Sequence, residues 1–460
     1  MDFSKIFYLI LFLQLSSNSL KGQNKIIVKQ TEDLAAYLEY IHEQKGFSGE
    51  VLIGNSNSIT FQKTIGLASN EHNVPLKPKA KYKIASITKT FTAALIAKAK
   101  VEGTLSFDDK ASQYIPELAS KFKSISIHQL LTHTSGLPHN EAIRDYWPVK
   151  SRLTLNSNQV IAEINKVDLL YEPGTQMHYS SLGYYLLATI LEKVYQEDYG
   201  QVLASKILSP LNMLSTGSSN SLAIIPEMTN GYHLVSDDSL VVAPYRNYSM
   251  LKGAGDLYSN GSDLLKWANT LLNQELLRNT TETPIFTPNG DFKDDSGRQY
   301  AYGWFIETGD RLKYSHGGGT WGYSSILALY PESNMSIVVL SNVSTLPTEA
   351  ILKNIEKIIF NEDFEVPKAK TQVASTSTDL DQYAGSYISD SGQMKLNIAK
   401  NENGLIAQMG GNPAFQIYPK GEHEFFGKKI EILFSFKLTN SIISGLTAER
   451  MGQKFEFKKQ

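Results

Sequence analysis

The sequence predicts an α/β domain followed by a small all-β domain. Three observations predict this order. Helical spacing of apolar residues alternates with strand-like runs through the first two thirds of the chain. A polar, Ser/Thr-rich stretch then interrupts the pattern. Beyond it, only short strand-like runs occur, broken by Gly, Asn and Lys. With 460 residues, the chain is long enough for two or three domains.

The first elements are a helix and a β-hairpin. The segment TEDLAAYLEYIHEQKG carries apolar residues at helical spacing and ends at Gly46. In GEVLIGNSNSITFQKTIGLAS, an Asn/Ser turn separates two strand-like runs, which predicts a hairpin. A second helix is expected from Ile84 to Val101 and is closed by Gly103.

The rest of the first domain mixes both kinds of element. Helices such as GYYLLATILEKVYQ and SDLLKWANTLL lie among Pro/Gly-rich loops between residues 104 and 280. From Tyr300 the runs YAYGWFIE, RLKYSHGGG, SSILALYPE and SIVVLSN predict strands. The helix TEAILKNIEKIIF closes this unit near Phe360. We therefore place the first domain at residues 25–362.

The end of the chain predicts a linker and a second domain. Residues 363–379 are polar, with one proline and a Ser/Thr run, as is typical of a linker. Residues 380–460 hold the short strand-like segments, which predict a small antiparallel barrel or sandwich.

The N-terminus has the layout of a secretory signal peptide, which we place at residues 1–22. Lys5 precedes an unbroken apolar run from Ile6 to Leu13, and a tail of small and polar residues follows. The run is too short to span a bilayer. The chain has no cysteine, so it has no site for a cysteine-linked lipid. We expect an exported, periplasmic or secreted protein without a stable membrane anchor.

Composition excludes several classes of function. A formal net charge of -2 gives no reason to expect nucleic acid as a partner. The absence of cysteine rules out a thiol nucleophile and a thiolate metal site. His128, His133 and His139 are close in sequence, but no acidic residue stands at a metal-site spacing. We expect neither a metal nor an organic cofactor, and a small-molecule or peptide-like substrate.

A serine three residues before a lysine is the first feature that carries chemistry. It occurs three times, as Ser86/Lys89, Ser120/Lys123 and Ser249/Lys252. Only Ser86 opens a long apolar helix, on which Lys89 would lie one turn away on the same face. A serine hydroxyl needs a positioned base, and a desolvated lysine loses its proton more easily than in water. The alternative is that Ser86 is simply the N-cap of the helix.

The second feature is the segment YEPGTQMHYSSLGYYLLATIL, in which a Pro-Gly turn precedes a helix. Tyr179 is a candidate general base for Ser86, or a proton donor to the leaving group. This role requires a lowered phenol pKa, which an adjacent lysine ammonium would provide. The alternative makes Tyr179 a core aromatic residue and Ser181 a helix cap.

The third feature is the segment LKYSHGGGTWGYSSILALYP, in which glycines interrupt a strand. Glycine in a strand often marks a close approach by a ligand. His316 would contact a substrate carboxylate or carbonyl, and the amide of Gly319 would complete an oxyanion hole with that of Ser86. A tight turn explains the three glycines equally well.

Taken in order, the three features resemble the serine beta-lactamase-like superfamily, in particular its branch of class C beta-lactamases, D-alanyl-D-alanine carboxypeptidases, D-aminopeptidases and carboxylesterases. The matching stretches include ASITKTFTAALIAKAKVEGTLSFDDKASQYIPEL, ISIHQLLTHTSGLP and GAGDLYSNGSDLLKWANTLL, and they cover residues 30–360. The resemblance implies an antiparallel sheet flanked by helices with a helical lobe inserted. The C-terminal domain resembles the lipocalin-like barrel appended to such hydrolases.

The resemblance also implies roles for individual residues. Ser86 is expected to accept the acyl group, with Lys89 and Tyr179 as its proton partners; which of the two is the base stays open. The substrate-binding residues are expected to be Ser181, His316, Gly317 and Gly318. Ser181 stands where the family usually has Asn, and His316 replaces a cationic lysine. Both departures count against an efficient beta-lactamase.

We therefore expect an exported serine hydrolase that acts on ester or amide, peptide-like substrates through a serine acyl-enzyme. The alternatives are a true class C-type beta-lactamase and a non-catalytic binding protein with the same fold. The physiological substrate and the oligomeric state do not follow from the sequence.

Overall fold

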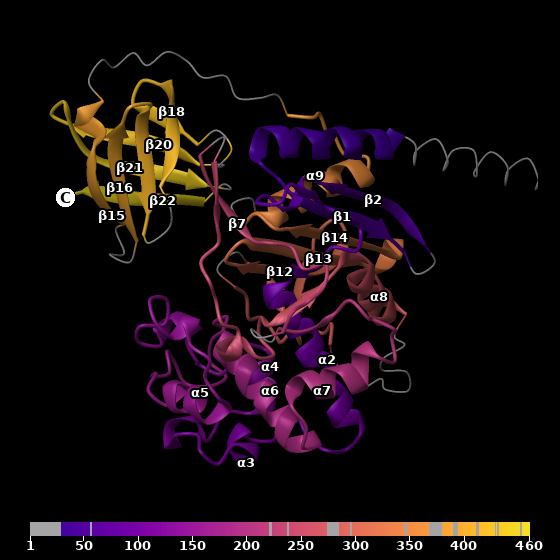
Figure 1. The fold of residues 1–460 in the computed structure, drawn as a ribbon. Coiled ribbons are helices and arrows are strands. Elements are labelled where there is room, and N and C mark those ends of the chain that lie inside the picture. Colours follow the sequence, from indigo (N-terminus) through magenta and orange to yellow (C-terminus); the bar gives the residue numbers. More distant parts are fainter. Residues whose placement is uncertain are drawn as a thin grey trace, which may run out of the picture.

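The computed structural model describes residues 29–55, 58–219, 223–236, 239–273, 285–294, 297–344, 347–367, 380–389, 394–410, 414–427, 429, 432–450 and 453–460. It shows an α/β domain and a separate C-terminal barrel (Figure 1). The expected signal peptide (residues 1–22) and most of the expected linker lie outside the described residues. Within the described ranges, every helix is too short or too polar to cross a bilayer.

The centre of the first domain is a seven-stranded antiparallel sheet in the order β10-β11-β12-β13-β14-β1-β2. Its strands are β1 (Gly49–Gly54), β2 (Ile59–Ile65), β10 (Gln299–Tyr300), β11 (Phe305–Thr308), β12 (Leu312–Thr320), β13 (Tyr323–Tyr330) and β14 (Met335–Ser341). The predicted β1–β2 hairpin is confirmed. β1 also pairs with β14, so the two ends of the domain meet in the middle of the sheet.

Both faces of the sheet are covered because its central strands carry apolar side chains on both faces. Val51 and Ile53 face the N-terminal helix (residues 29–45) and α9 (Thr348–Ile359). Leu52 lies in the larger core on the opposite face, with α2 (Thr88–Val101) and α8 (Gly261–Leu272). The predicted antiparallel sheet flanked by helices is confirmed.

A helical lobe lies beyond α2, at the bottom of Figure 1. Its helices are α3 (Ala111–Tyr114), α4 (Ile127–Leu131), α5 (Ser157–Ile164), α6 (Ser181–Tyr195) and α7 (Tyr199–Leu203). α7 continues into a single π-helical turn, η5 (Ala204–Leu208). The 3-10 turns are η1 (Ala85–Ile87), η2 (Ser120–Phe122), η3 (Asn140–Ala142), η4 (Lys150–Arg152), η6 (Ser249–Leu251) and η7 (Pro331–Ser333).

Three short sheets complete the domain. They pair β3 (Leu67–Ser69) with β4 (Val74–Pro75), join β5 (Tyr82–Lys83), β9 (Leu257–Ser259) and β6 (Gly217–Ser218), and pair β7 (Tyr232–Ser236) with β8 (Ser239–Val242). β9 lies between β5 and β6, so it holds the segment that leads into η1 and α2.

The C-terminal domain is a closed barrel, introduced by η8 (Asp381–Tyr383). Its strands follow one another around it: β15 (Gly385–Ser389), β16 (Lys395–Asn401), β17 (Gly404–Met409), β18 (Phe415–Gly421), β19 (Glu424–Phe426), β20 (Leu433–Thr439), β21 (Ile442–Arg450) and β22 (Gln453–Lys459). Closure, in which β22 pairs with β15, removes both edge strands. Of the two predicted forms, barrel and sandwich, the structure has the barrel.

The barrel core includes side chains from the first domain. Tyr232 and Leu234 of β7, and Val343 just after β14, pack with barrel residues such as Phe434 and Leu446. In Figure 1, β7 lies between the sheet and the barrel. The two domains therefore share one apolar cluster.

Candidate active site

Ser86 lies in η1, the 3-10 turn that enters α2. The predicted helix from Ile84 to Val101 is thus right in position, but its α-helical part begins only at Thr88. The alternative that Ser86 is the helix N-cap is wrong, because the caps of η1 and α2 are Ile84 and Ile87. Ser86 is partly exposed, whereas its neighbours on both sides are buried.

The backbone around Ser86 is held in an unusual conformation. Ala85 has a φ of 45°, in the left-handed region that costs a non-glycine residue about 1–3 kcal/mol. The preceding carbonyl, of Ile84, accepts a hydrogen bond from Ser325 Oγ at 2.9 Å, and the Ile84 amide donates to Leu257 O at 3.0 Å. These bonds from β13 and β9 hold the turn that presents Ser86.

Lys89 is completely buried behind Ser86. Its Nζ lies 3.2 Å from Ser86 Oγ, 3.3 Å from Ser181 Oγ and 2.7 Å from the carbonyl oxygen of Ala254. No carboxylate among the described residues lies within ion-pairing distance of this amine. Burial alone therefore places the pKa of Lys89 well below its usual value. A buried, uncompensated lysine beside a reachable serine fits the predicted nucleophile and base.

Tyr179 covers this pair with its ring. Lys89 Nζ lies 4.7 Å from the ring centroid, and the side chain of Tyr179 is hydrogen-bonded to Ser86. The expectation of a lowered phenol pKa is wrong for the free protein, because burial raises the pKa of Tyr179 despite that hydrogen bond. The physical reason is that burial disfavours the phenolate by more than the Ser86 hydrogen bond and the charge of Arg298 favour it.

Ser181 is the first residue of α6 and is also buried. The alternative that Ser181 caps this helix is wrong, since the N-cap is Ser180, whose Oγ accepts from the Gly183 amide. Ser181 Oγ is left free to face Lys89 on one side and His139 Nε2, at 3.0 Å, on the other. The structure thus places Ser181 beside the lysine.

His316 lies on β12 and is buried rather than open to solvent. Its Nε2 is 3.2 Å from the Tyr300 hydroxyl, and its Nδ1 is 2.7 Å from the Gly317 carbonyl. Burial, followed by the charge of Lys89, lowers the pKa of His316 to about 3. The imidazole is therefore neutral near pH 7 and does not replace the charge of a lysine.

The glycines after His316 differ in how much space a side chain would find at their positions. A Cβ on Gly318 would come within 2.2 Å of Ile84 O, so β12 can only pack against the Ser86 segment without a side chain there. A Cβ on Gly319 would meet nothing within 4 Å, so its surroundings are open. Strand β11 pairs with β12 only as far as Ser315, so among the described residues no strand pairs with this edge of β12 at Gly319. The oxyanion role of Gly319 stays a prediction.

Sequence reasoning missed several neighbours of the site. Ala254 supplies a carbonyl to Lys89, and only the family-like stretch that contains it hinted at such a role. His133 has a φ of 59° and accepts from the Ser180 amide at 3.1 Å, which positions the turn before α6. Arg298 packs over the ring of Phe305 at 4.0 Å beside the site, and no sequence pattern marks it.

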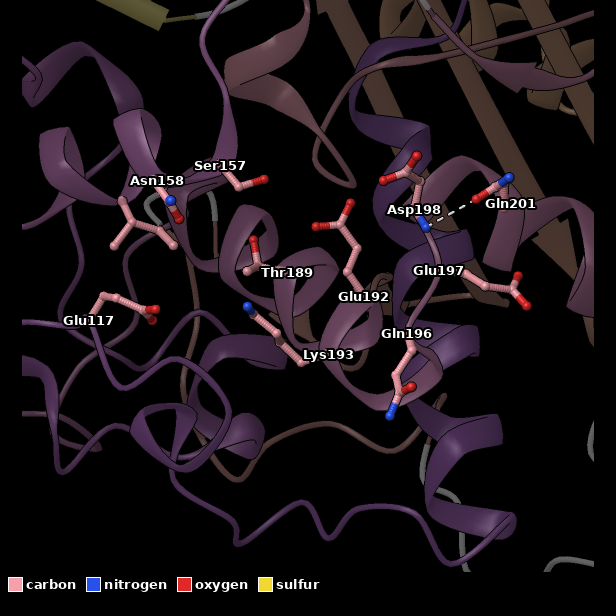
Figure 2. A pocket seen from close by; sticks show the side chains of 11 residues that line it. Glu117, Ser157, Asn158, Thr189, Glu192, Lys193, Gln196, Glu197, Asp198 and Gln201 are labelled. Atoms are coloured by element: carbon pink, nitrogen blue, oxygen red, sulfur yellow. Dashed lines mark hydrogen bonds between the residues drawn. The ribbon is translucent and has the colours of Figure 1, made fainter.

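A hollow in the helical lobe does not coincide with this site (Figure 2). It has a volume of about 410 Å³, and Figure 2 shows acidic side chains around it, with the Asp198 amide bonded to Gln201. None of the predicted site residues lines it.

Comparisons with known proteins agree with this geometry. The family model described as Beta-lactamase matches residues 34–359. Penicillin-binding protein 4* of Bacillus subtilis (strain 168) is 27% identical over 438 residues, covering 88% of this chain and 93% of that protein. A penicillin binding protein from Bacillus halodurans has a similar structure, with a TM-score of 0.62, 27% identity, and coverage of 70% of this chain and 98% of that one. An octameric penicillin-binding protein homologue from Pyrococcus abyssi shares the fold over 93% of this chain and 99% of its own, with a TM-score of 0.63 and 21% identity.

Proposed function

The chain belongs to the beta-lactamase family, and from this premise we propose that it is an exported serine hydrolase that cleaves ester or amide bonds of peptide-like substrates through an acyl-enzyme at Ser86. One observation carries the proposal. Lys89 is fully buried without a carboxylate partner among the described residues, and it lies 3.2 Å from a partly exposed serine hydroxyl. Such an amine is costly to bury and is suited to take a proton near neutral pH.

Acylation begins when the Ser86 oxygen attacks the substrate carbonyl and its proton moves to Lys89 Nζ. The negative charge that develops on the carbonyl oxygen is received by the amides of Ser86 and Gly319. Tyr179, whose raised pKa keeps its hydroxyl protonated, is suited to donate a proton to the leaving group. The proton on Lys89 then returns to Tyr179, whose ring centroid lies 4.7 Å from Lys89 Nζ, so that both groups regain their starting states.

Water completes the reaction by attacking the ester carbonyl at Ser86. The same groups act in reverse: Lys89, or Tyr179 through it, accepts a proton from the water, and Ser86 leaves with its hydroxyl restored. The coupled protons of Lys89 and Tyr179 make the pair, rather than one residue, the acid–base unit.

The proposed substrate class rests on two features of the site: a neutral residue at His316 and a short side chain at Ser181. His316 is neutral near pH 7, so it does not attract the carboxylate of a beta-lactam as a lysine would. Ser181 is shorter than an amide side chain and is occupied by Lys89 and His139. Both favour small esters or peptide-like amides over rapid beta-lactam turnover.

A true beta-lactamase is the second candidate, and the penicillin-binding relatives favour at least acylation by penicillins. The distinguishing quantity is the rate of deacylation. A slow release of penicillin with fast ester turnover supports the first candidate, and rapid nitrocefin hydrolysis supports the second.

Two probes test the nucleophile. A fluorophosphonate and a fluorescent penicillin should both label the wild-type protein and fail to label Ser86→Ala, while the matched variant Ser249→Ala labels normally. If neither probe labels the wild-type protein, the serine hydrolase proposal is wrong and the alternative of a non-catalytic binding protein remains. Labelling that survives Ser86→Ala would mean that the nucleophile is misassigned.

Substrate class is then read from initial rates on p-nitrophenyl esters, nitrocefin and peptides ending in D-Ala-D-Ala. Export is tested separately, by expressing the full chain in a Gram-negative host and determining the N-terminus of the mature protein by mass spectrometry. Cleavage near residues 19–22 is expected, and an intact N-terminus in the cytoplasm would contradict export.

A further inference from the structure

A continuous row of hydrogen bonds leads from Lys89 away from Ser86. Lys89 Nζ lies 3.3 Å from Ser181 Oγ, and Ser181 Oγ lies 3.0 Å from His139 Nε2. The other ring nitrogen of His139, Nδ1, is hydrogen-bonded to the carboxylate of Glu141. Glu141 belongs to η3, so a loop of the helical lobe is connected to the buried lysine through α6.

The chemistry of these groups fixes the direction of each bond. An ionised carboxylate only accepts hydrogen bonds, so His139 Nδ1 donates to Glu141 and leaves Nε2 as an acceptor. Ser181 then donates its single proton to Nε2, and its oxygen can accept from Lys89. Burial would raise the pKa of Glu141, but the hydrogen bond from His139 and the nearby charge of Arg246 contribute to lowering it below its usual value.

Matching the N–H groups of Lys89 to their acceptors also shows where its lone pair points. A neutral amine has two N–H groups and one lone pair. The Ala254 carbonyl, at 2.7 Å, takes one N–H, and the Ser181 oxygen takes the other. The remaining partner is Ser86 Oγ, so the lone pair faces the hydroxyl proton of the nucleophile.

We propose that Glu141, His139 and Ser181 are positioning residues that set the direction of this row of hydrogen bonds and thereby aim the lone pair of Lys89 at Ser86. This inference rests on the proposed function, because it concerns the base that activates Ser86. It also gives Ser181 a role other than substrate binding. The residue that stands where an amide is usual works here together with a His–Glu pair.

The row works only if His139 Nε2 is an acceptor. A ring that donated from both nitrogens would force Ser181 to accept from His139 and to turn its own proton toward Lys89, where that proton would compete with Ser86 for the lone pair. Several titratable or charged groups surround His139. Glu141 in η3 and Tyr179 before α6 contact its ring, and Lys89 in α2, His133 after α4 and Arg246 near Glu141 lie further away.

Three variants of the full-length protein separate positioning from mere packing. His139→Gln keeps an acceptor for Ser181 and a donor for Glu141 but does not titrate. His139→Leu removes both functions. Ser181→Asn offers Lys89 an amide oxygen that needs no orientation by His139. His233→Leu is the matched control, because His233 also bonds a serine, Ser344, but does so at β7.

Turnover of p-nitrophenyl acetate from pH 5 to 9 is the main readout. We expect His139→Leu to lower kcat by about 10- to 100-fold with KM changed less than about twofold. His139→Gln should recover most of kcat, because the amide oxygen can accept from Ser181 while the amide nitrogen donates to Glu141. In the Ser181→Asn background, His139→Leu should lower kcat by less than about threefold, and His233→Leu should have no effect.

Two results would overturn the inference. One is an equal loss for His139→Leu and His139→Gln at every pH, which indicates packing alone. The other is a loss for His139→Leu that is the same in the wild-type and Ser181→Asn backgrounds. A thermal melt of each variant identifies loss of folding, and the His139→Gln comparison stays informative if His139→Leu fails to fold. If Ser86→Ala retains turnover, the proposed function itself falls; if Ser86→Ala is inactive and His139→Leu is fully active, only this inference falls.

Discussion

Two regions of the molecule carry a serine three residues before a lysine and have opposite surroundings. Ser86 and Lys89 begin in the 3-10 turn η1, and Ser249 and Lys252 begin in the 3-10 turn η6. Among the described residues, the partners of Lys89 within hydrogen-bonding distance are all uncharged. Lys252 has Glu192, whose carboxylate lies 2.5 Å from its Nζ.

The difference indicates that the spacing between serine and lysine does not decide whether the lysine can act as a base. The side chains around the lysine decide it. Lys252 forms an ion pair with Glu192, and an ammonium in an ion pair has no lone pair with which to accept a proton. Ser249 is correspondingly used for structure, since its Oγ accepts from the Leu155 amide at 3.0 Å and donates to Leu153 O at 3.2 Å. Four changes test this comparison.

The largest effect is expected for removal of each amine. Lys89→Met should lower kcat/KM for a p-nitrophenyl ester by at least about 1000-fold, because Ser86 loses its base. Lys252→Met should leave kcat/KM within about twofold. Steady-state kinetics on both purified variants provide the check, and equal losses would contradict the distinction.

Giving Lys89 a carboxylate should make it resemble Lys252. In Ser181→Asp, an acidic group replaces a hydroxyl 3.3 Å from Lys89 Nζ, and an adjacent negative charge raises the pKa of the amine. Because the neutral amine is the active form, the acidic limb of the kcat/KM profile should move to higher pH. Activity at pH 7 should fall about tenfold for each unit of that shift.

Unchanged activity in Ser181→Asp across the pH range would show that Lys89 is not the base. The control is Ser181→Asn, because asparagine is close to aspartate in size but carries no charge. The acidic limb of its kcat/KM profile should stay near that of the wild type.

The stabilities of the two methionine variants should change in opposite directions. The folded state lowers the pKa of Lys89, so between that value and 10.5 it binds fewer protons than the unfolded chain. The lowered pKa therefore destabilises the folded state at pH 7, and this loss of stability diminishes as the pH rises toward 10.5. Lys89→Met removes the cost and should raise the free energy of unfolding at pH 7 by about 1–3 kcal/mol. Lys252→Met strands Glu192 and should lower it by about 1–2 kcal/mol. Urea titrations at pH 7 and pH 9 measure both.

The smallest effect is expected for Glu192→Gln. The two side chains of this ion pair are only 17% and 19% exposed, so the lost attraction should cost about 1 kcal/mol. The glutamine still accepts a hydrogen bond from Lys252, which limits the loss. Thermal melts with and without added salt measure it, and a fall in esterase activity would contradict the view that this pair is structural.

Most of the fold was predictable because it depends on local pattern. The β1–β2 hairpin, the strands from residue 300 onward and the C-terminal barrel follow from alternating runs and turn residues. The order of strands in the sheet was not predictable from periodicity, since the pairing of β1 with β14 joins residues almost 300 positions apart. It came from the family resemblance.

The sequence motifs predicted which side chains lie together around Ser86, but not the electrostatics of the group. Ser86, Lys89, Tyr179 and Ser181 were singled out by motif, and the structure brings them together. The sign of the Tyr179 pKa shift was wrong because burial, a property of the folded chain, outweighs a charge that the sequence suggested. The contact of His139 with Ser181 was equally hidden, because 42 residues of loop and helix separate them.

The cluster that β7 shares with the barrel has a consequence for solubility. Without residues 380–460, the side chains of Tyr232, Leu234 and Val343 would lose their apolar neighbours and face water. Exposed apolar patches of this kind promote self-association. The barrel therefore covers apolar side chains that would otherwise favour self-association of the first domain.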